Sequence, residues 1–534
     1  MASVAESAGG QQPSRSDIRL VISASSVGTI FEWYDFFIYG TLAASGIIGR
    51  TFFPTGNEMV QTLLAWAGFA VGFGFRPLGA VLFGFLGDRL GRKYTFLITI
   101  TVMGLATAGV GLVPSAAAIG FAAPVIIILL RVAQGLALGG EYGGAAIYVA
   151  EHSPPGKSGY FTSFIQASVA GGFVLSLAVV LLTKSAMSAE TWDAWGWRFP
   201  FVFSLLLLAV SLWMRLKLSE SPVFKAIKAA GETARNPFVE SFTYPGNIRR
   251  LIVAMLGIAA GLTVIWYTAM FSVLSFLQGT MRVAPTAAQL LTGVGAAAGL
   301  FWFVFFGRLS DRVGRKKPIV IGYAATLVLL FPIFWVIGSA ANPHLAAAAE
   351  RAPVVVSGPD CSYSPFAREQ DDACGRLLDT FSKKGIAYST VKAPATTVTI
   401  GGVPIENPTP DRIDAALAAN GYSLDPVVPG GRDILVILIA ILCLSALSGA
   451  TYGPVAALLA EMFPPRIRYS SMSIPYHLGC GYFGGFLPFI SQYVVARTGD
   501  PYAGLWYTWA VVALALVVTL FWLEEPHPGA ANAR

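Results

Sequence analysis

Long stretches of the chain are almost entirely apolar and are interrupted at short intervals by glycine, proline and charged residues. Several of these stretches, such as 94–130 and 434–460, contain no charged residue. A helix needs about 20 mostly apolar residues to cross the hydrocarbon core of a membrane. Dividing the apolar stretches at their turn residues predicts twelve membrane-spanning helices, which begin near residues 20, 60, 94, 118, 159, 198, 250, 285, 318, 432, 469 and 501. The pattern is that of an all-α polytopic membrane protein.

One charged turn occurs twice in this apolar sequence, as GFLGDRLGRKY at 84–94 and as GRLSDRVGRKK at 307–317. A second pair of matching segments is YGGAAIYVAEHSPP at 142–155 and YGPVAALLAEMFPP at 452–465. The copies are 223 positions apart in the first pair and 310 in the second. Two six-helix pseudo-repeats explain both pairs, provided that the second half carries about 87 additional residues between the ninth and tenth predicted helices.

The additional residues lie within 342–431, a polar segment rich in turn residues that predicts a small α+β lobe on the outer side of the membrane. Its patterns predict two helices and two strands, at 366–384, 410–420, 387–391 and 396–404. The lobe contains Cys361 and Cys374, two of the four cysteines of the chain. These two would pair in an oxidising compartment, and two free thiols are the alternative.

Both ends of the chain are polar, and the first residues show no short apolar region like that of a cleaved signal peptide. A disordered tail is therefore expected before the first helix. The chain then divides into a cytoplasmic tail at 1–19, a six-helix half at 20–218, a cytoplasmic loop at 219–247, the first part of the second half at 248–341, a periplasmic insertion at 342–431, the remainder of the second half at 432–523 and a cytoplasmic tail at 524–534.

Lysine and arginine concentrate in alternate connections between the predicted helices. Charged residues make up only 12% of the chain, and the formal net charge is +7. The connections on the side of the N-terminus carry most of the basic residues, whereas the short opposite connections carry only Arg50, Lys184, Arg282 and Arg497. By the positive-inside rule, this asymmetry places both termini of a multi-pass membrane protein in the cytoplasm. The basic balance therefore reflects membrane topology and not nucleic-acid binding.

Several segments resemble transporter signatures. The repeated turn at 84–94 resembles the best-known signature of the major facilitator superfamily, and LSESPVF after the sixth helix resembles its mid-chain signature. More narrowly, four segments resemble the metabolite:proton symporter family: FEWYDFFIYG (31–40), RPLGAVLFGFLGDRLGR (76–92), RVAQGLALGGEYGGAAIYVAE (131–151) and WGWRFPF (195–201). The resemblance covers nearly all of the chain outside the insertion and the tails. It implies alternating-access transport of a metabolite such as α-ketoglutarate, citrate, shikimate, proline or betaine, without deciding which one.

The two copies of the charged turn would lie on the same face of the membrane, one in each half. Opposite charges in a short, rigid turn can hold that face closed in one state and separate in the other. We therefore expect a conformational latch, and a simple topology signal is the alternative. The expected gating residues are Asp88, Arg89, Arg92, Asp311, Arg312, Arg315, Glu151 and Glu461.

Ionisable residues inside the predicted helices cost about 2.5 to 3.5 kcal/mol each, so each implies a partner or a role. Glu32 and Asp35 are three residues apart and share one helical face. Their repulsion would raise the proton affinity of one of them, as a proton-coupled carrier requires, and structural salt bridges are the alternative. Glu141 and His477 are further candidates for proton coupling, and each could instead be a structural hydrogen-bonding residue.

Arg131 lies deep in the fourth predicted helix, with no acidic residue within reach on that helix. Its planar guanidinium could bind the carboxylate of a substrate or form a fixed ion pair with Glu32 or Asp35. Arg76 is a second candidate for anion binding, although Pro77 beside it favours a structural role. The expected substrate-binding residues are Arg131, Arg76, Tyr34, Tyr39, Gln134 and Tyr142.

The sequence contains no recognisable catalytic constellation. The four histidines are scattered, histidine and cysteine do not occur at zinc-type spacing, and there is no GxxxxGK[ST] phosphate loop. We therefore expect a transporter and not an enzyme, with no metal or cofactor and with protons as the coupling ion. The expected partners are a small anionic or zwitterionic substrate and the lipid bilayer, and the monomer is expected to be functional. A receptor that binds a ligand with the outer lobe, and an exporter of the same fold, are the alternatives.

Overall fold

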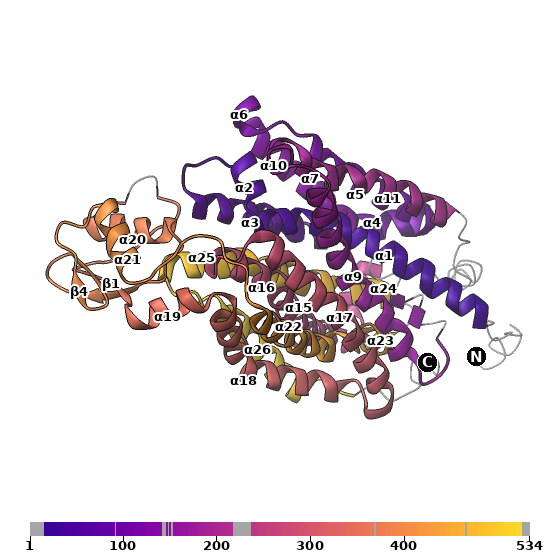
Figure 1. The fold of residues 1–534 in the computed structure, drawn as a ribbon. Helices are drawn as coiled ribbons and strands as arrows, with labels where there is room; N and C mark the ends of the chain where they lie inside the picture. Colours follow the sequence, from indigo (N-terminus) through magenta and orange to yellow (C-terminus); the bar gives the residue numbers. More distant parts are fainter. Residues whose placement is uncertain are drawn as a thin grey trace, which may run out of the picture.

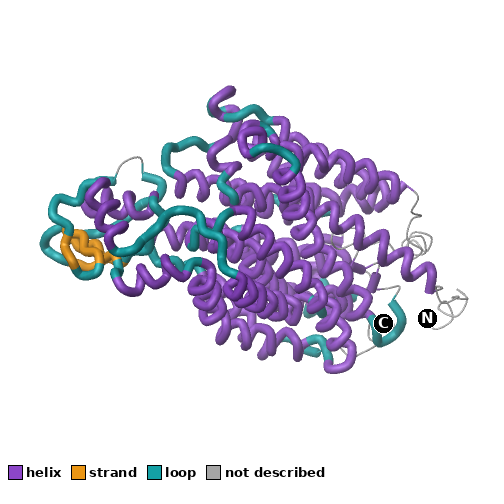
Figure 2. Tube along the Cα trace, in the orientation of Figure 1, coloured by secondary structure: helices purple, strands orange, loops and turns teal. Residues whose placement is uncertain are grey.

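The chain forms a bundle of long helices with a small lobe at one end of the bundle (Figure 1). We refer to the bundle end that carries the lobe, residues 342–431, as the lobe end. Within the described part of the chain, strands occur only in this lobe (Figure 2). The computed structural model describes residues 15–90, 92–140, 146–147, 149–150, 153–216, 237–367, 370–464 and 467–525.

The first half of the bundle is built from helices that begin and end at the turn residues of the sequence. Asn57, for example, starts α3 because its side chain accepts hydrogen bonds from the backbone N–H groups of Met59 and Val60. The helices are α1 (Arg15–Ala44), α2 (Ile47–Phe52), α3 (Glu58–Gly74), α4 (Arg76–Leu90), α5 (Arg92–Leu112), α6 (Ala116–Ile119), α7 (Ala122–Gly139), α9 (Ser158–Ser185), α10 (Ala189–Ala194), the 3₁₀ turn η1 (Gly196–Arg198) and α11 (Phe199–Leu216).

The second half contains two helices that alternate between α and π geometry. The first runs without interruption from Asn247 to Thr280, and the second includes Pro475 in its interior. The elements of the second half are α13 (Pro237–Thr243), α14 (Asn247–Ile252), η2 (Val253–Ala259), α15 (Ala260–Tyr267), η3 (Thr268–Ser272), α16 (Val273–Ser275), η4 (Phe276–Thr280), α17 (Pro285–Val313), α18 (Lys316–Ala341), α22 (Gly431–Tyr452), α23 (Val455–Met462), α24 (Arg468–Leu478), η5 (Gly479–Gly485), α25 (Leu487–Thr498) and α26 (Leu505–Trp522). The segments η2 to η5 have π geometry.

Helices occupy each of the twelve positions predicted for membrane spans. Of the described residues, nine helices are long and apolar enough to cross a membrane, and 97–112 is a shorter apolar helix. The all-helical membrane fold is therefore confirmed, while the count of twelve spans stays a prediction. One boundary differs from expectation, because α1 begins at Arg15 and so includes the last residues of the expected disordered tail.

The two halves pack against each other along helices from different repeats. α9 lies between α1 of its own half and α17 of the second half, and α4 packs against α24. Glycine makes the approach of α9 and α17 close, because a Cβ atom at Gly307 would lie 2.7 Å from the carbonyl oxygen of Gly159. One apolar core runs through both halves as a result and includes Trp33, Phe37 and Trp266.

The lobe has a hydrophobic core of its own, separate from that of the bundle, and Cys361 and Cys374 form a disulfide in it. Its sheet has the strand order β2-β1-β3-β4, in which β1 pairs parallel with β2 and antiparallel with β3. Its elements are α19 (Pro343–Arg351), β1 (Val354–Gly358), α20 (Ala373–Lys383), β2 (Ser389–Lys392), β3 (Thr397–Ile400), β4 (Val403–Pro404) and α21 (Pro410–Ala419).

The lobe follows the α+β expectation but differs from it in detail. The helix expected at 366–384 begins only at Ala373, because the side chain of Asp372 accepts from the N–H of Gly375 and caps it. The single strand expected at 396–404 is a hairpin, since Gly401 and Gly402 adopt positive φ angles of 61° and 80° and reverse the chain. Strand β1 and helix α19 were not among the expected elements.

Candidate functional site

A narrow cavity lies between the two halves, near the middle of the bundle. Its volume is about 10 Å³, which is close to what a single water molecule needs. The first half lines it with Trp33, Phe37, Arg76 and Val169, and the second half with Leu262, Thr263, Trp266, Tyr267, Tyr452, Tyr476 and Cys480. The bundle is therefore tightly closed around a point where mostly aromatic side chains from both halves meet.

Arg76, at the start of α4, is the charged residue of this cavity. It is fully buried, and none of its three guanidinium nitrogens has a hydrogen-bond partner among the described residues. Its guanidinium lies 5.1 Å from the ring centroids of both Trp33 and Phe73. Cation–π contacts offset only part of the cost of burying a permanent charge without hydrogen bonds. The guanidinium of Arg76 is thus buried without a hydrogen-bond acceptor among the described residues.

Two further donors of the cavity lining are buried without a hydrogen-bond partner among the described residues. They are the indole N–H of Trp266 and the hydroxyl group of Tyr267. Both residues lie at the end of α15, directly before the π-helical segment η3. Together with the guanidinium of Arg76, they provide hydrogen-bond donors from both halves to one small space.

Arg131 has a different environment. It is also fully buried, but it donates to Oε1 of Gln134 at 2.6 Å and to the backbone carbonyls of Gly68, Phe36 and Phe69 at 3.4 to 3.5 Å. Its guanidinium stacks over the rings of Phe36 and Tyr39, at 4.2 and 4.5 Å from their centroids. The structure places Arg131 within the packing of α1, α3 and α7, where it neither lines the cavity nor pairs with Glu32 or Asp35.

The other substrate candidates of the described chain also lie beside the cavity and not in its lining. Tyr34 donates its hydroxyl hydrogen to the carbonyl of Pro200 at 2.5 Å. Tyr39 lies against the guanidinium of Arg131. The amide nitrogen of Gln134 donates to the hydroxyl of Thr107 at 2.7 Å. Arg76 is the expected substrate residue that the cavity contains.

The proton-coupling candidates Glu32, Asp35 and His477 are all buried, and none of them belongs to the cavity lining. The two carboxylates alternate on α1 with the lining residues Trp33 and Phe37. Oδ1 of Asp35 has no hydrogen-bond partner among the described residues. His477 follows the lining residue Tyr476 on α24, and their two rings meet edge to face.

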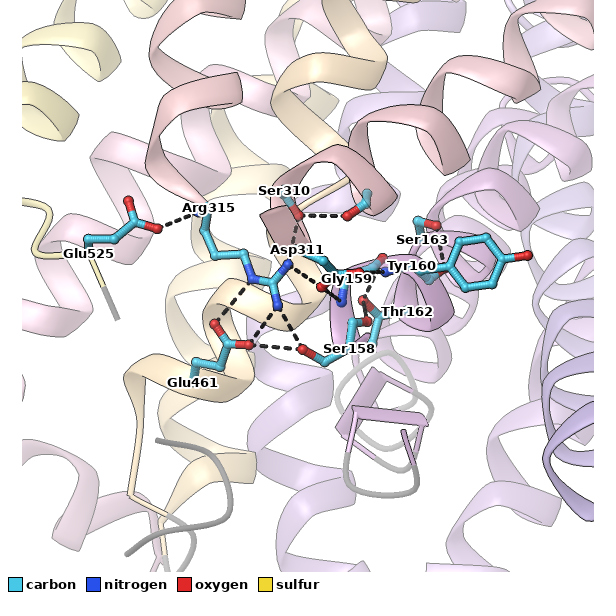
Figure 3. Close-up of polar contacts among 11 residues, drawn as sticks. Ser158, Gly159, Tyr160, Thr162, Ser163, Ser310, Asp311, Arg315, Glu461 and Glu525 are labelled. Atoms are coloured by element: carbon cyan, nitrogen blue, oxygen red, sulfur yellow. Dashed lines mark hydrogen bonds and ion pairs between the residues drawn. The ribbon is translucent and has the colours of Figure 1, made fainter. Parts of the chain in front are cut away.

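At the end of the bundle away from the lobe, Arg315 is the centre of a polar network (Figure 3). It donates to both carboxylate oxygens of Glu461, at 2.9 and 3.2 Å, to Asp311 at 2.7 Å and to Ser158 at 2.8 Å. Burial alone would lower the pKa of Arg315, but the hydrogen bonds and ion pairs with Glu461 and Asp311 outweigh burial and raise that pKa. We call Asp311, Arg315, Glu461 and Ser158 the gate cluster.

The gate cluster joins the two halves. The carboxylate of Asp311 accepts from the backbone N–H groups of Gly159 and Tyr160, both at 2.8 Å, and so caps the N-terminus of α9 in the other half. Glu525 accepts from the backbone N–H groups of Arg315 and Lys316 at the start of α18. The contacts of Asp311 and Arg315 thus link the two halves at this end of the bundle.

The remaining expected gating residues contribute less or are not described. Arg312 is exposed and lies outside the gate cluster. The residues Glu141, Tyr142 and Glu151, and the side chains of Asp88, Arg89 and Arg92, lie outside the described part of the chain.

Towards the lobe end, aromatic side chains from both halves close the cavity. The ring of Phe271, on η3, lies 5.3 Å from that of Phe69, 5.8 Å from that of Trp66 and 4.9 Å from that of Phe173. These four residues form an aromatic plug, in which only Phe271 comes from the second half. The described residues thus join the halves by polar contacts at one end of the bundle and by aromatic contacts towards the other.

Sequence reasoning did not single out Trp266, Tyr267, Phe271 or Cys480. All four lie in apolar helices whose sequence gives no sign of which face points to the centre. Ser158 was also missed, and its position at the start of α9, facing Glu461, depends on contacts between the halves.

The sequence matches known transporters over most of its length. A family model described as sugar (and other) transporter matches residues 20–241. The chain is 29% identical over 511 residues to the inner membrane metabolite transport protein YhjE of Escherichia coli K12, with 95% of this chain and 94% of that protein covered. It is 36% identical over 327 residues to the shikimate transporter of the same strain, covering 60% of this chain and 73% of that protein.

A further relative is the proline/betaine transporter of Escherichia coli K12, which is 35% identical over 328 residues, or 60% of this chain and 65% of that protein. Among solved structures, a D-xylose-proton symporter matches with a TM-score of 0.60 at 16% identity, over 96% of this chain and 99% of that one. At this identity the structural likeness shows the fold alone. The sequence relatives are carriers, and the chain therefore belongs to the major facilitator superfamily of metabolite transporters and is not an enzyme.

Proposed function

We propose that the protein is a proton-coupled importer of a small carboxylate-bearing metabolite, which works by alternating access in a bacterial inner membrane with both termini in the cytoplasm. The observation that carries the substrate class is Arg76, whose buried guanidinium has no hydrogen-bond partner among the described residues and lies between the two halves. A carboxylate accepts two parallel hydrogen bonds from a guanidinium and cancels its charge. Opening of the cavity would expose Arg76 to such a substrate.

The names of the relatives support the same substrate class. Proline, betaine and shikimate, which name the relatives compared above, each carry a carboxylate. The aromatic rings around Arg76 would in addition favour a cationic group on the substrate, since aromatic faces attract quaternary ammonium groups. A zwitterion would therefore use both features of the cavity.

Proton coupling is supported by the two buried carboxylates on α1, Glu32 and Asp35. They share α1 with the lining residues Trp33 and Phe37, and a charge bound at Arg76 would change the proton affinity of a carboxylate buried in the same bundle. Import driven by a proton gradient follows from that coupling. A ligand sensor, the rival function, would have no need of closures at both ends of the bundle.

Cys480 offers a direct test of the cavity. Within the described residues the free thiols are Cys480, buried in the cavity lining, and Cys443, which is exposed. In a Cys443→Ser background, a bound substrate should slow the alkylation of Cys480 by N-ethylmaleimide at least fivefold. Glycine betaine, proline, shikimate and α-ketoglutarate are the ligands to compare, each followed by uptake into vesicles with and without an inward proton gradient.

The matched control is a Cys480→Ser variant that retains Cys443. The rate at which the exposed Cys443 is alkylated should be the same with and without each ligand. Protection that disappears in Arg76→Ala would support carboxylate binding at Arg76. Protection that survives in Arg76→Ala, or uptake that does not respond to the proton gradient, would contradict the corresponding part of the proposal.

A further inference from the structure

The lobe is fixed to the second half of the bundle. Arg282, in the connection after η4, donates to the backbone carbonyls of Lys384 and Leu424 in the lobe. From the lobe, the backbone N–H of Tyr388 donates to the carbonyl of Gly499 in the second half at 3.2 Å. A Cβ atom at Gly499 would lie only 2.6 Å from the ring of Tyr388, so glycine is required there. The lobe and the second half should therefore move together.

The lobe touches the first half in a much smaller way. α20 lies against the start of α3 (Figure 1). Among the described residues, the one hydrogen bond between them runs from Nδ2 of Asn57 to Oδ1 of Asp379 at 3.2 Å. This bond crosses the seam between the halves, where a carrier must open to admit a substrate from the lobe end. Separation of the halves would break it.

A hollow of about 220 Å³ lies beneath this contact, where the first half, the second half and the lobe meet. This volume is larger than that of several water molecules in the liquid, so the hollow suits a small metabolite. Each of the three units contributes one charged side chain to the lining: Glu58 from α3, Arg282 from the second half and Lys383 from α20. The carboxylate of Glu58 lies in the same lining as the guanidinium of Arg282, while Nζ of Lys383 is paired with Oδ2 of Asp379 at 2.6 Å. Charges of both signs thus border the hollow, which suits a molecule with one charge of each sign.

Arg282 shows a second unusual feature. Its φ angle is 54°, in the left-handed region that a side chain other than glycine rarely adopts. Such backbone strain persists where the surroundings impose it and is frequent at binding sites. Burial lowers the pKa of Arg282, and the negative charge of Glu58 partly opposes that effect, so the two groups interact electrostatically across the hollow.

The hollow lies on the lobe side of the central cavity, along the helix that lines both. Gln278, which lines the hollow, follows the cavity residue Tyr267 by 11 positions on the same helix, or about 16 Å along its axis. Phe271 of the aromatic plug lies between them in the sequence. A molecule bound in the hollow would therefore be on the lobe side of the aromatic plug.

We propose that the hollow is a second, outer binding site for a zwitterionic substrate, with its carboxylate near Arg282 and Lys383 and its cationic group near Glu58. The lobe forms one wall and closes the site through the contact of Asp379 with Asn57. This inference rests on the proposed transport function and narrows its substrate to a zwitterion.

Binding stoichiometry tests the outer site. Purified full-length protein in lipid nanodiscs should bind two molecules of radiolabelled glycine betaine or proline per chain in equilibrium dialysis. Arg76→Ala should leave one of them, and Glu58→Gln combined with Lys383→Gln should also leave one. Lys392→Gln, a matched loss of a lysine on the exposed strand β2, should leave both.

The outcomes separate this inference from the proposed function. One molecule per chain, lost entirely in Arg76→Ala, overturns the outer site and leaves the proposed function intact. Binding of shikimate with no binding of glycine betaine or proline would also overturn the outer site and leave the proposed function intact. Binding that survives in Arg76→Ala and is lost in the Glu58/Lys383 variant supports the outer site and contradicts the role of Arg76.

Crosslinking tests the closure by the lobe. In a Cys443→Ser, Cys480→Ser background, Asn57→Cys and Asp379→Cys place two thiols across the seam. A short bifunctional maleimide should reduce uptake by the double variant at least tenfold relative to the same variant without reagent. For each single variant, uptake with and without the reagent should be equal. Undiminished uptake by fully crosslinked protein would show that the lobe does not move away from the first half.

Discussion

Arg76 and Arg131 are both fully buried in the first half, yet their partners differ completely. Arg131 has an amide oxygen, three backbone carbonyls and two aromatic rings around it. Arg76 has aromatic faces but no hydrogen-bond acceptor among the described residues. Because an arginine cannot lose its charge, an incoming carboxylate would supply both the acceptors and the opposite charge that Arg76 lacks among the described residues. The two residues should therefore respond in opposite ways to substitution.

Replacement of Arg76 by alanine should abolish substrate affinity while leaving the fold in place. A bidentate, charge-assisted contact contributes about 3 kcal/mol, so kcat/KM for uptake should fall about 100-fold or more. Arg76→Lys keeps the charge but loses the planar pair of donors, and it should recover part of the affinity. The measurements are uptake into proteoliposomes and the thermal unfolding temperature. Uptake at the wild-type rate by Arg76→Ala would remove the residue from the site.

Replacement of Arg131 should act on stability. Arg131→Met keeps the apolar length of the side chain but removes hydrogen bonds that link α7 to α1 and α3. The loss should be on the order of 2 to 3 kcal/mol, because Oε1 of Gln134 is left without its donor. We expect a lower unfolding temperature and an unchanged affinity per folded molecule in a binding titration. A full loss of binding at unchanged stability would instead assign Arg131 to the substrate.

The sequence alone could identify the charged residues that are costly to bury in a membrane helix. It could not show which of them find hydrogen-bond partners in the fold. Arg76 and Arg131 were both recognisable, since a charge within an apolar helix needs an explanation. The acceptors of Arg131 are mainly backbone carbonyls of neighbouring helices, and a sequence gives no information about which carbonyls a side chain will reach. Trp266 and Tyr267 carried no signal, because every neighbour in their helix is also apolar or small.

At the scale of elements, the repeated turn predicted Asp311 and Arg315 as residues of the gate cluster. The π-helical segments were not predicted. The charged turn at 307–317 ends α17 and begins α18, where Asp311 and Arg315 reach the other half. π-Helical segments lie on both sides of α15, which carries Trp266 and Tyr267, and Cys480 lies within η5. Such segments are frequent at functional sites. A uniformly apolar helix has no periodicity from which a change of helical pitch could be read.

The gate predicts a defined effect of Asp311→Asn. The amide has one acceptor oxygen in place of two, and it no longer attracts Arg315 or the N-terminus of α9 by charge. A loss of about 1.4 kcal/mol would shift the equilibrium towards opening at this end about tenfold. Alkylation of Cys480 should accelerate by that factor while net uptake falls. Arg312→Gln, on the same turn but exposed, is the control and should change neither rate.

At the scale of the whole molecule, the described residues join the two halves at each end of the bundle by a different kind of contact. The gate cluster uses charges and depends on salt only weakly because it is buried, whereas the aromatic plug depends on burial of apolar surface. Composition and the repeat predicted the halves, the insertion and the side of the charged turns. They could not predict which state the chain adopts, because each state satisfies the same hydrophobic pattern.

The two closures predict opposite changes in access to the central cavity. Phe271→Ala removes the ring that the second half contributes to the plug, so a membrane-impermeant maleimide added at the lobe side should reach Cys480 faster. Glu461→Gln weakens the hold on Arg315 and should instead favour access from the opposite side. In sealed vesicles of either orientation, with Cys443→Ser as background, the ratio of the two alkylation rates should move in opposite directions for the two variants. A ratio that moves in the same direction in both would mean that the two closures do not control separate sides of one cavity.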